Sequence, residues 1–232
     1  MLYELGAGLT VLAMTAGCSA NGDHSDGKPN GIEKQSVDRI FTRVDKALDA
    51  ASVHTVQLSG GRTLVDVHTL HGGDSCTGLF TDEQGFAWHF TTLGGRIWIS
   101  PRRRSTQLAD RTGASVEPGR YLPVEVSSPG FAGTLAQRTS ASCHMRFSVL
   151  KQQHMVFTKG AETRVNGRPV LAVKAEQGDV KSTVYLATTG EPVPLRVVGH
   201  DGKHVFTTTW QDYGVSPKIA RPPKSKILPS LS

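Results

Sequence analysis

The spacing at which hydrophobic residues recur changes once along the chain, near Val53. Before it, between about Glu33 and Ala51, apolar residues recur every three or four positions, which predicts one amphipathic helix. Asn30 and Glu33 have the spacing of a capping box at its start. The apolar stripe of this helix comprises Val37, Ile40, Phe41, Val44, Ala47, Leu48 and Ala51.

From Val53 onward the period is two, which is typical of strands with one buried face. Runs rich in Val, Thr, Phe, Trp and Tyr predict strands near 53–59, 63–70, 75–81, 86–92, 95–100, 154–159, 163–176, 180–188, 193–199 and 203–210. Turns of hairpin type occur at Ser59-Gly60-Gly61, Leu93-Gly94-Gly95, Asn166-Gly167 and Asp201-Gly202. Successive hairpins predict an antiparallel meander and exclude βαβ units.

The interval from about 101 to 151 interrupts the strand pattern. Within it only Tyr121–Val126 resembles a strand, whereas Ser105–Arg111 and Phe131–Ser140 are expected to form short helices against the sheet. The tail from Ser216 contains several prolines, so it is expected to be irregular or extended.

The start of the chain indicates export. Leu5–Ala16 is apolar over about twelve residues, too short to span a bilayer and suited to a signal peptide. It ends in Thr15-Ala16-Gly17-Cys18, which resembles a bacterial lipobox. We therefore expect a signal peptide over 1–17, a lipidated Cys18 with a flexible tether over 18–31, and a single domain over 32–232. A buried apolar segment with an incidental cysteine is the alternative.

Composition narrows the choice of partners. Of 232 residues, 38% are hydrophobic and 20% charged, which favours a folded chain over disorder. The net charge of +6 favours anionic partners such as lipid headgroups, but no nucleic-acid motif accompanies it, so no nucleic-acid partner is expected. Arg102-Arg103-Arg104, with basic residues of the tail, could contact headgroups or form a solvated loop.

The cysteine count agrees with export. If Cys18 is acylated, Cys76 and Cys143 remain, and an even remainder is what an oxidising compartment predicts. Both lie among small polar neighbours, which predicts a disulfide near the surface. A metal site is the rival, but neither cysteine belongs to a C-x-x-C or C-x-x-H pattern.

No catalytic or metal motif accompanies these features, so neither an enzyme nor a cofactor is expected. His68-x-x-His71 and His200-x-x-x-His204 are the close histidine pairs. Spacing of three on a strand directs the first pair to opposite faces, and a turn separates the second. No G-x-S-x-G, S-x-x-K or carboxylate pair is in a catalytic context.

Several segments resemble the lipoprotein-carrier superfamily, and in particular the LppX/LprG-type lipoproteins of actinobacteria. The resemblance covers about residues 32 to 224. Its segments are Ala50-Ala51-Ser52-Val53-His54, Cys76-Thr77-Gly78, Val165-Asn166-Gly167-Arg168-Pro169-Val170, Thr183-Val184-Tyr185-Leu186-Ala187 and Pro192-Val193-Pro194-Leu195-Arg196-Val197.

The resemblance implies an α+β, LolA-like fold: a strongly curved antiparallel half-barrel sheet, with an N-terminal helix and short helices covering its concave face. In some members acyl chains occupy the space between sheet and helices. Aromatic residues that could line such a cavity here either do so or pack as a closed core. The candidates are Phe86, Trp88, Phe90, Trp98, Met155, Phe157 and Tyr185.

These observations predict a monomeric lipoprotein, held by a fatty-acyl (palmitate) anchor on the extracytoplasmic face of the cell membrane. It would bind or carry a lipid or other amphiphile. The alternative is an envelope interaction or sensor protein with the same fold, a filled core and no lipid cargo.

Overall fold

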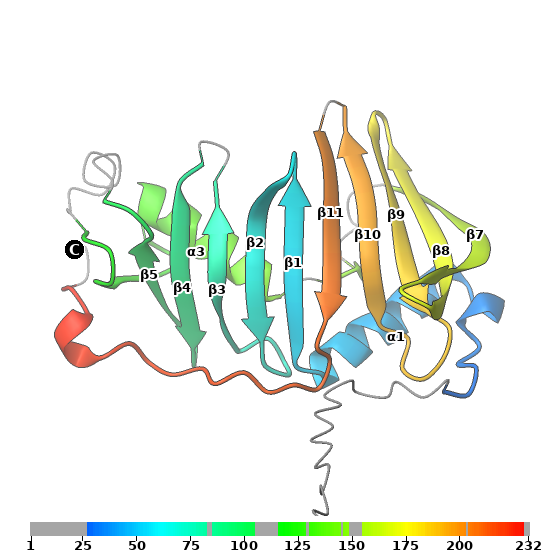
Figure 1. The fold of residues 1–232 in the computed structure, drawn as a ribbon, viewed down its shortest axis with the longest axis horizontal. Helices are drawn as coiled ribbons and strands as arrows, with labels where there is room; N and C mark the ends of the chain where they lie inside the picture. Colours follow the sequence, from blue (N-terminus) through cyan, green and yellow to red (C-terminus); the bar gives the residue numbers. More distant parts are fainter. Residues whose placement is uncertain are drawn as a thin grey trace, which may run out of the picture.

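A computed structural model of the chain describes residues 27–82, 85–104, 116–128, 130–144, 146–148, 155–202 and 204–229 (Figure 1). The predicted signal peptide, Cys18 and the helix expected at Ser105–Arg111 lie outside these residues. Among the described residues, no helix is both long enough and apolar enough to cross a bilayer.

Eleven strands form one open antiparallel sheet in the order β6-β5-β4-β3-β2-β1-β11-β10-β9-β8-β7. The first six are β1 (Val53–Ser59), β2 (Arg62–Thr69), β3 (Ser75–Thr81), β4 (Ala87–Leu93), β5 (Arg96–Pro101) and β6 (Leu122–Val124). The others are β7 (Val156–Val165), β8 (Arg168–Gln177), β9 (Val180–Ala187), β10 (Pro194–Asp201) and β11 (His204–Gln211). Within the described ranges, the helical segments are η1 (Ile32–Lys34), α1 (Val37–Ala50), α3 (Gly130–Cys143) and η2 (Lys224–Lys226).

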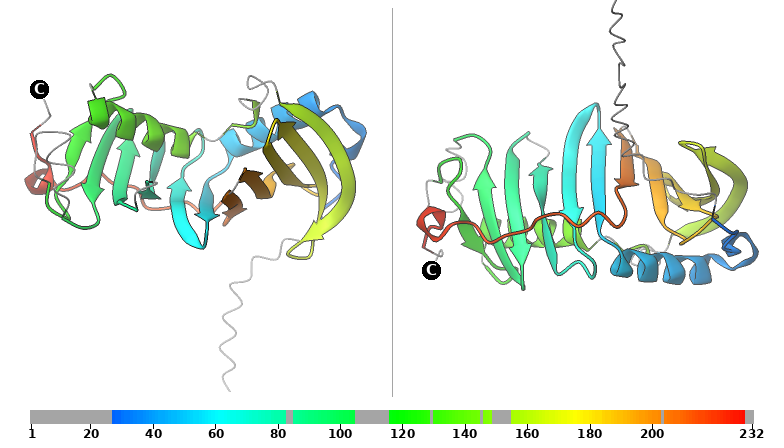
Figure 2. Two further views of the ribbon diagram at one scale, coloured as in Figure 1. Left: turned by 90° about the horizontal axis from the view of Figure 1, so that it is seen from above. Right: turned by 60° about the horizontal axis from the view of Figure 1, so that its bottom comes forward.

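Two meanders join at the centre of this sheet, where β1 pairs with β2 on one side and with β11 on the other. The sheet curves, most strongly at the β7–β9 end, and it does not close into a barrel (Figure 2). The predicted fold class, an α+β curved half-barrel, is therefore confirmed.

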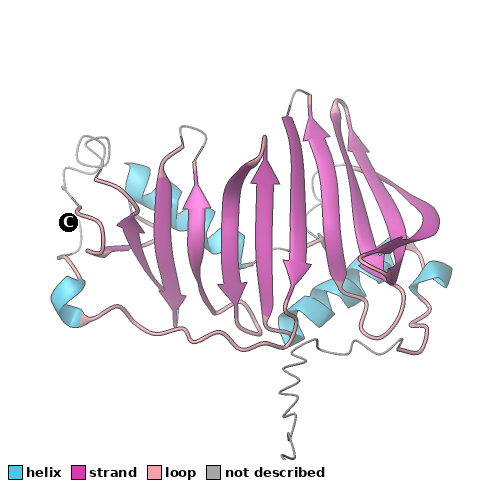
Figure 3. Cartoon of the chain, in the orientation of Figure 1, coloured by secondary structure: helices cyan, strands magenta, loops and turns pink. Residues whose placement is uncertain are grey.

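Both long helices lie on one face of the sheet and divide it between them (Figure 3). Helix α1 directs Ile40, Phe41 and Val44 into a core with strands β8 to β11. Helix α3 directs Leu135 and Ala136 into a second core with strands β2 to β6. Each half of the sheet thus has its own helix to cover its apolar face.

The helix predicted at 33–51 is shorter in the structure. Gln35 and Ser36 are not helical, so η1 and α1 are separate elements. The predicted capping box is wrong, because Oδ1 of Asn30 accepts a hydrogen bond from the backbone N–H of Ile32 at 3.2 Å instead.

The boundary between the strands predicted at 154–159 and 163–176 is misplaced. Strand β7 continues through Val165, and β8 begins at Arg168. The backbone turns at Asn166 and Gly167, with φ of 49° and 79°. Positive φ at both central residues defines a tight hairpin turn of type I′, which fixes the boundary regardless of side-chain alternation.

The C-terminal tail is extended, as predicted, and runs along the face of the sheet opposite the helices (Figure 2). Ile97 and Ile99 face the core beneath α3, so Trp98 between them faces the other way. There the Arg221 guanidinium lies 5.6 Å from the centroid of the Trp98 ring. Farther along, Ile227 forms a parallel bridge with Tyr121.

Candidate functional site

The structure does not bring the predicted cavity residues together. Trp88 and Phe90 are buried beneath α3, and Phe86 packs against them from a half-buried position. Phe157 packs into the other core, beneath α1, while Met155 is half-buried near the start of β7. Two candidates lie elsewhere: Trp98 on the outer face under the tail, and Tyr185 against a small cluster around Ala187 and Leu195.

The core beneath α3 is filled by aromatic rings. Trp88 and Phe90 are only 2% and 1% exposed. Phe80 lies against both, with ring centroids 6.5 and 6.2 Å away, and Phe131 of α3 covers Trp88 edge-on at 6.1 Å. These contacts favour the closed-core interpretation for this part of the sheet.

The core beneath α1 is filled in the same way. Phe41 is fully buried and meets Phe157 edge-on, with ring centroids 5.1 Å apart. Phe147 lies 5.7 Å from Phe41 on one side and 5.7 Å from Trp210 on the other. This row of rings connects α1 to β7 and to the central strand β11.

A large pocket opens where the C-terminal half of α1 meets the ends of β8 and β9. Its volume is about 740 Å³, which is within the range of small-molecule sites. The walls come from α1, from the beginning of β8, from the turn after β9, and from the residues that follow β11. They comprise Gly27, Arg43, Lys46, Ala47, Ala50, Ala51, Arg168, Pro169, Thr189, Gly190, Glu191, Pro192, Val193, Tyr213 and Gly214.

The lining of this α1 pocket is amphipathic. Alanine, proline and valine side chains form its apolar part, whereas Arg43, Lys46 and Arg168 contribute positive charge and Glu191 one carboxylate. Nη1 of Arg43 donates a hydrogen bond to the backbone oxygen of Asn30 at 3.0 Å, which anchors that side chain. The arrangement can accept an apolar group beside an anionic one.

Tyr213 fixes one wall of the α1 pocket. Its hydroxyl donates a hydrogen bond to the backbone oxygen of Pro194 at 2.5 Å. Burial raises the pKa of Tyr213 well above its ordinary value of 10.0, although Arg168 acts in the opposite direction. The hydroxyl therefore stays neutral, and its role is to join the residues after β11 to β10.

The predicted disulfide is present between Cys76 of β3 and Cys143 at the end of α3, with Cα atoms 5.9 Å apart. Its expected position near the surface is wrong, because both residues are buried. Cys76 lies on the helix-covered face of the sheet, so the bridge connects the sheet to α3 from inside the core.

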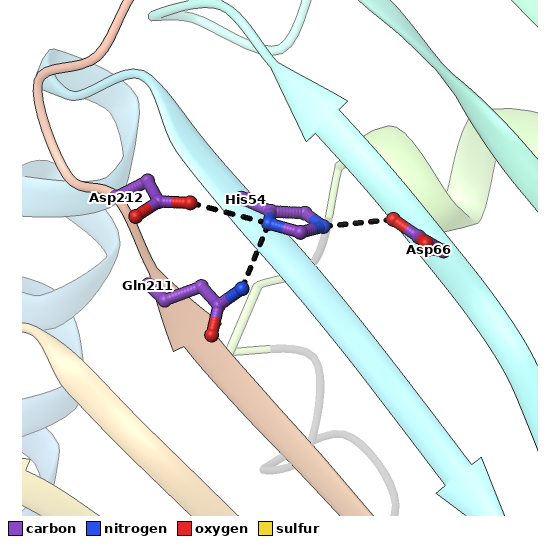
Figure 4. Close-up of polar contacts among 4 residues, drawn as sticks. All are labelled: His54, Asp66, Gln211 and Asp212. Atoms are coloured by element: carbon purple, nitrogen blue, oxygen red, sulfur yellow. Dashed lines mark hydrogen bonds and ion pairs between the residues drawn. The ribbon is translucent and has the colours of Figure 1, made fainter.

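A polar cluster that the sequence did not predict lies on the outer face, at the junction of the two meanders. His54 of β1 is central to it (Figure 4). Nε2 of His54 lies 2.7 Å from Oδ1 of Asp66, and its Nδ1 lies 3.3 Å from Oδ2 of Asp212 and 2.9 Å from Nε2 of Gln211. The ring of His68 stacks on that of His54, with centroids 3.9 Å apart and planes inclined by 15°.

Cross-strand register explains why the histidine pattern was misleading. His68 lies directly opposite His54 of the neighbouring strand, so its partner is not His71, three residues away in sequence. Burial, followed by the adjacent His54, lowers the pKa of His68, while Asp66 and Asp212 act in the opposite direction. Regular pairing across the Gly60-Gly61 turn would place Val67 opposite His54. A register shift between Gln57 and Leu58 brings His68 there instead, and no signal in the spacing of the histidines predicts that shift.

Comparison with protein families and with curated proteins gives no match. Solved structures with a similar fold include LprF from Mycobacterium bovis, with 13% identity, a TM-score of 0.46, and 79% of this chain and 95% of that chain covered. The Mycobacterium tuberculosis lipoprotein LppX has 12% identity and a TM-score of 0.49, with 80% and 100% covered. A LolA superfamily protein from Nitrosomonas europaea has 11% identity and a TM-score of 0.33, with 79% and 95% covered.

These neighbours are of the kind that the sequence resemblance named. At such identities the likeness concerns the arrangement of strands and helices alone.

Proposed function

We propose that this protein is an exported, lipid-anchored binding protein that holds an amphiphile in the α1 pocket. The observation that carries the proposal is the composition of this pocket, which combines about 740 Å³ of space with an apolar wall and the cations Arg43, Lys46 and Arg168. An acyl or other apolar group would lie along the apolar wall, and an anionic head would lie beside the cations.

The position of the α1 pocket relative to Cys18 supports the same function. Gly27 lines the pocket and follows Cys18 by nine residues. Nine extended residues span about 30 Å at most. A lipid on Cys18 would therefore keep the mouth of the pocket within about 30 Å of the membrane surface, where an amphiphilic ligand is delivered or withdrawn.

A second candidate function is that of an envelope interaction or sensor protein without lipid cargo. The observation that favours it is the closed packing of the two aromatic cores, around Trp88 and Phe41. The two functions differ in one measurable property, which is whether a ligand occupies the α1 pocket.

The decisive experiment fills the α1 pocket with a bulky side chain. Ala50 is exposed on α1 and lines the pocket, so Ala50→Trp reduces its volume without disturbing a core. Thr42→Trp is the matched control, because Thr42 is exposed on the same helix and does not line the pocket. We expect Ala50→Trp to weaken binding of a fluorescent anionic fatty acid at least about tenfold, which is 1.4 kcal/mol.

Equal binding by both tryptophan variants would exclude the α1 pocket as the site. Failure of the wild-type protein to bind or to co-purify with any lipid, judged by native mass spectrometry of protein from its own host, would favour the sensor function.

Anchoring is tested separately with Cys18→Ala. We expect this substitution to move the protein from the membrane fraction to the soluble fraction. An uncleaved and still membrane-bound variant would show that the N-terminal segment is itself an anchor.

A further inference from the structure

We propose that the outer-face cluster of His54, His68 and Asp66 is a binding site for a divalent transition-metal ion, and specifically for Zn²⁺. It is separate from the α1 pocket, since no residue of the cluster lines that pocket. Imidazole nitrogen and carboxylate oxygen are established ligand types for this ion.

The register of the sheet places the three ligands on one face. His54 pairs with His68 across the β1–β2 ladder, and Asp66 precedes His68 by two residues on the same strand. Residues two apart on a strand share a face, and directly opposed residues have Cβ atoms about 5 Å apart. Rigid sheet backbone thus positions all three, instead of flexible loops.

The distances are compatible with one bound ion. One ligand atom from each of the three residues lies within 4.8 Å of the others. Nε2 of His54 and Oδ1 of Asp66 are 2.7 Å apart. Ligands about 2.0 Å from a tetrahedral ion are separated by about 3.3 Å, so this pair opens by about 0.6 Å on binding. The ring of His68, which stacks on that of His54 at 3.9 Å, must turn to direct a nitrogen lone pair at the same ion. Asp66 can make that adjustment, because its side chain is 45% exposed.

Groups around His54 complete the second layer of the site. Asp212 and Gln211, at the end of β11, contact Nδ1 of His54, the ring nitrogen that is not directed at Asp66. A partner on the second nitrogen fixes the orientation of a ligating imidazole. Asp66 and Asp212 together supply two negative charges, which balance the charge of a divalent cation.

An ion can reach the cluster from solvent. A shallow pocket of about 280 Å³ opens on the outer face and has Asp66 and His68 in its wall. The fourth position of a tetrahedral ion is then available to water or to a group of a partner.

The test is calorimetric titration of the metal-stripped, full-length protein with ZnCl₂, repeated with CoCl₂ to record the visible absorption of bound Co²⁺. We expect one ion per chain. His54→Ala with His68→Ala should weaken binding at least about a hundredfold. Asp66→Asn keeps both rings and the shape of the strand but removes a ligating carboxylate. It should weaken binding by at least the roughly tenfold that loss of a group supporting a ligand costs.

The matched control is His200→Ala with His204→Ala, since both histidines are exposed and belong to β10 and β11 away from the cluster. Its affinity should equal that of the wild type. The proposal is overturned if wild-type protein shows no saturable binding, if the control loses binding equally, or if Asp66→Asn and the His54/His68 variant bind as the wild type does.

Discussion

The carboxylate of Asp45 accepts a hydrogen bond of 2.7 Å from the backbone N–H of Phe147, 102 residues later in the chain. Its second oxygen accepts another, of 3.0 Å, from the backbone N–H of Ser148. Asp45 is buried on α1, so these bonds tie that helix to the segment that follows α3. They hold the connection between α3 and β7 against α1, where Phe147 enters the core of that helix.

Removing this carboxylate should therefore destabilise the whole domain. Asp45→Ala leaves two backbone N–H groups without their acceptor, and hydrogen bonds to a charged group contribute about 1.5–3 kcal/mol each. We expect the free energy of unfolding in urea to fall by about 2–4 kcal/mol. Asp49→Ala is the control: its ion pair with Arg146 is half-exposed, so its loss should cost less than about 1 kcal/mol. Equal losses in the two variants would contradict the assigned role of Asp45.

The disulfide should be a major source of stability. It closes a loop of 67 residues between β3 and α3, for which the chain-entropy model gives about 4 kcal/mol. Replacing Cys76 and Cys143 with serine should lower the unfolding free energy by about 2–5 kcal/mol. Alkylation of the unfolded wild-type protein without reductant should label neither cysteine. Labelling of both would show that the bridge does not form.

The tail should shield Trp98 from solvent. Trp98 is 3% exposed although it lies on the outer face, and Arg221 covers its ring at 5.6 Å. A chain ending at Ala220 should therefore show stronger acrylamide quenching of tryptophan fluorescence than the full chain. Trp88 and Trp210 are buried in the cores and should contribute little to the change. Trp98→Phe, combined with the truncation, should abolish the increase.

His89 should make stability depend on pH. Partial burial of its ring, followed by the nearby Arg102, lowers the pKa of His89 below its ordinary value of 6.5. Just below pH 6.5 the histidine is protonated in the unfolded chain but still largely neutral in the folded chain. The free energy of unfolding therefore decreases as the pH falls from 6.5 toward the lower pKa of the folded state. His89→Gln should make the drop in melting temperature between pH 7.5 and pH 5.5 slightly smaller. An unchanged or larger drop would contradict the lowered pKa.

The spacing of apolar residues and of glycine turns in the sequence predicted most of the order of helices and strands. The three- and four-residue spacing around Ile40 and Phe41 predicted α1, because one face of a helix must be buried. Period-two runs broken by glycine turns predicted the antiparallel meander, and the spacing of Phe131–Ser140 predicted α3. Boundaries were predicted less well. Helix α1 begins at Val37 and not at Glu33, and β8 begins at Arg168, after the turn at Asn166 and Gly167.

Tertiary structure alone decided which side chains meet. The alternation of side chains along a strand predicts that Trp98 and Phe90 each face one side of the sheet. Strand order and register determine which side that is. They place Trp98 under the tail and Phe90 in the core. The same register stacks His54 on His68, and the joining of β1 to β11 brings Asp212 to them. Contacts between residues about 150 positions apart have no signature in local spacing, because they depend on how the strands are ordered in the sheet.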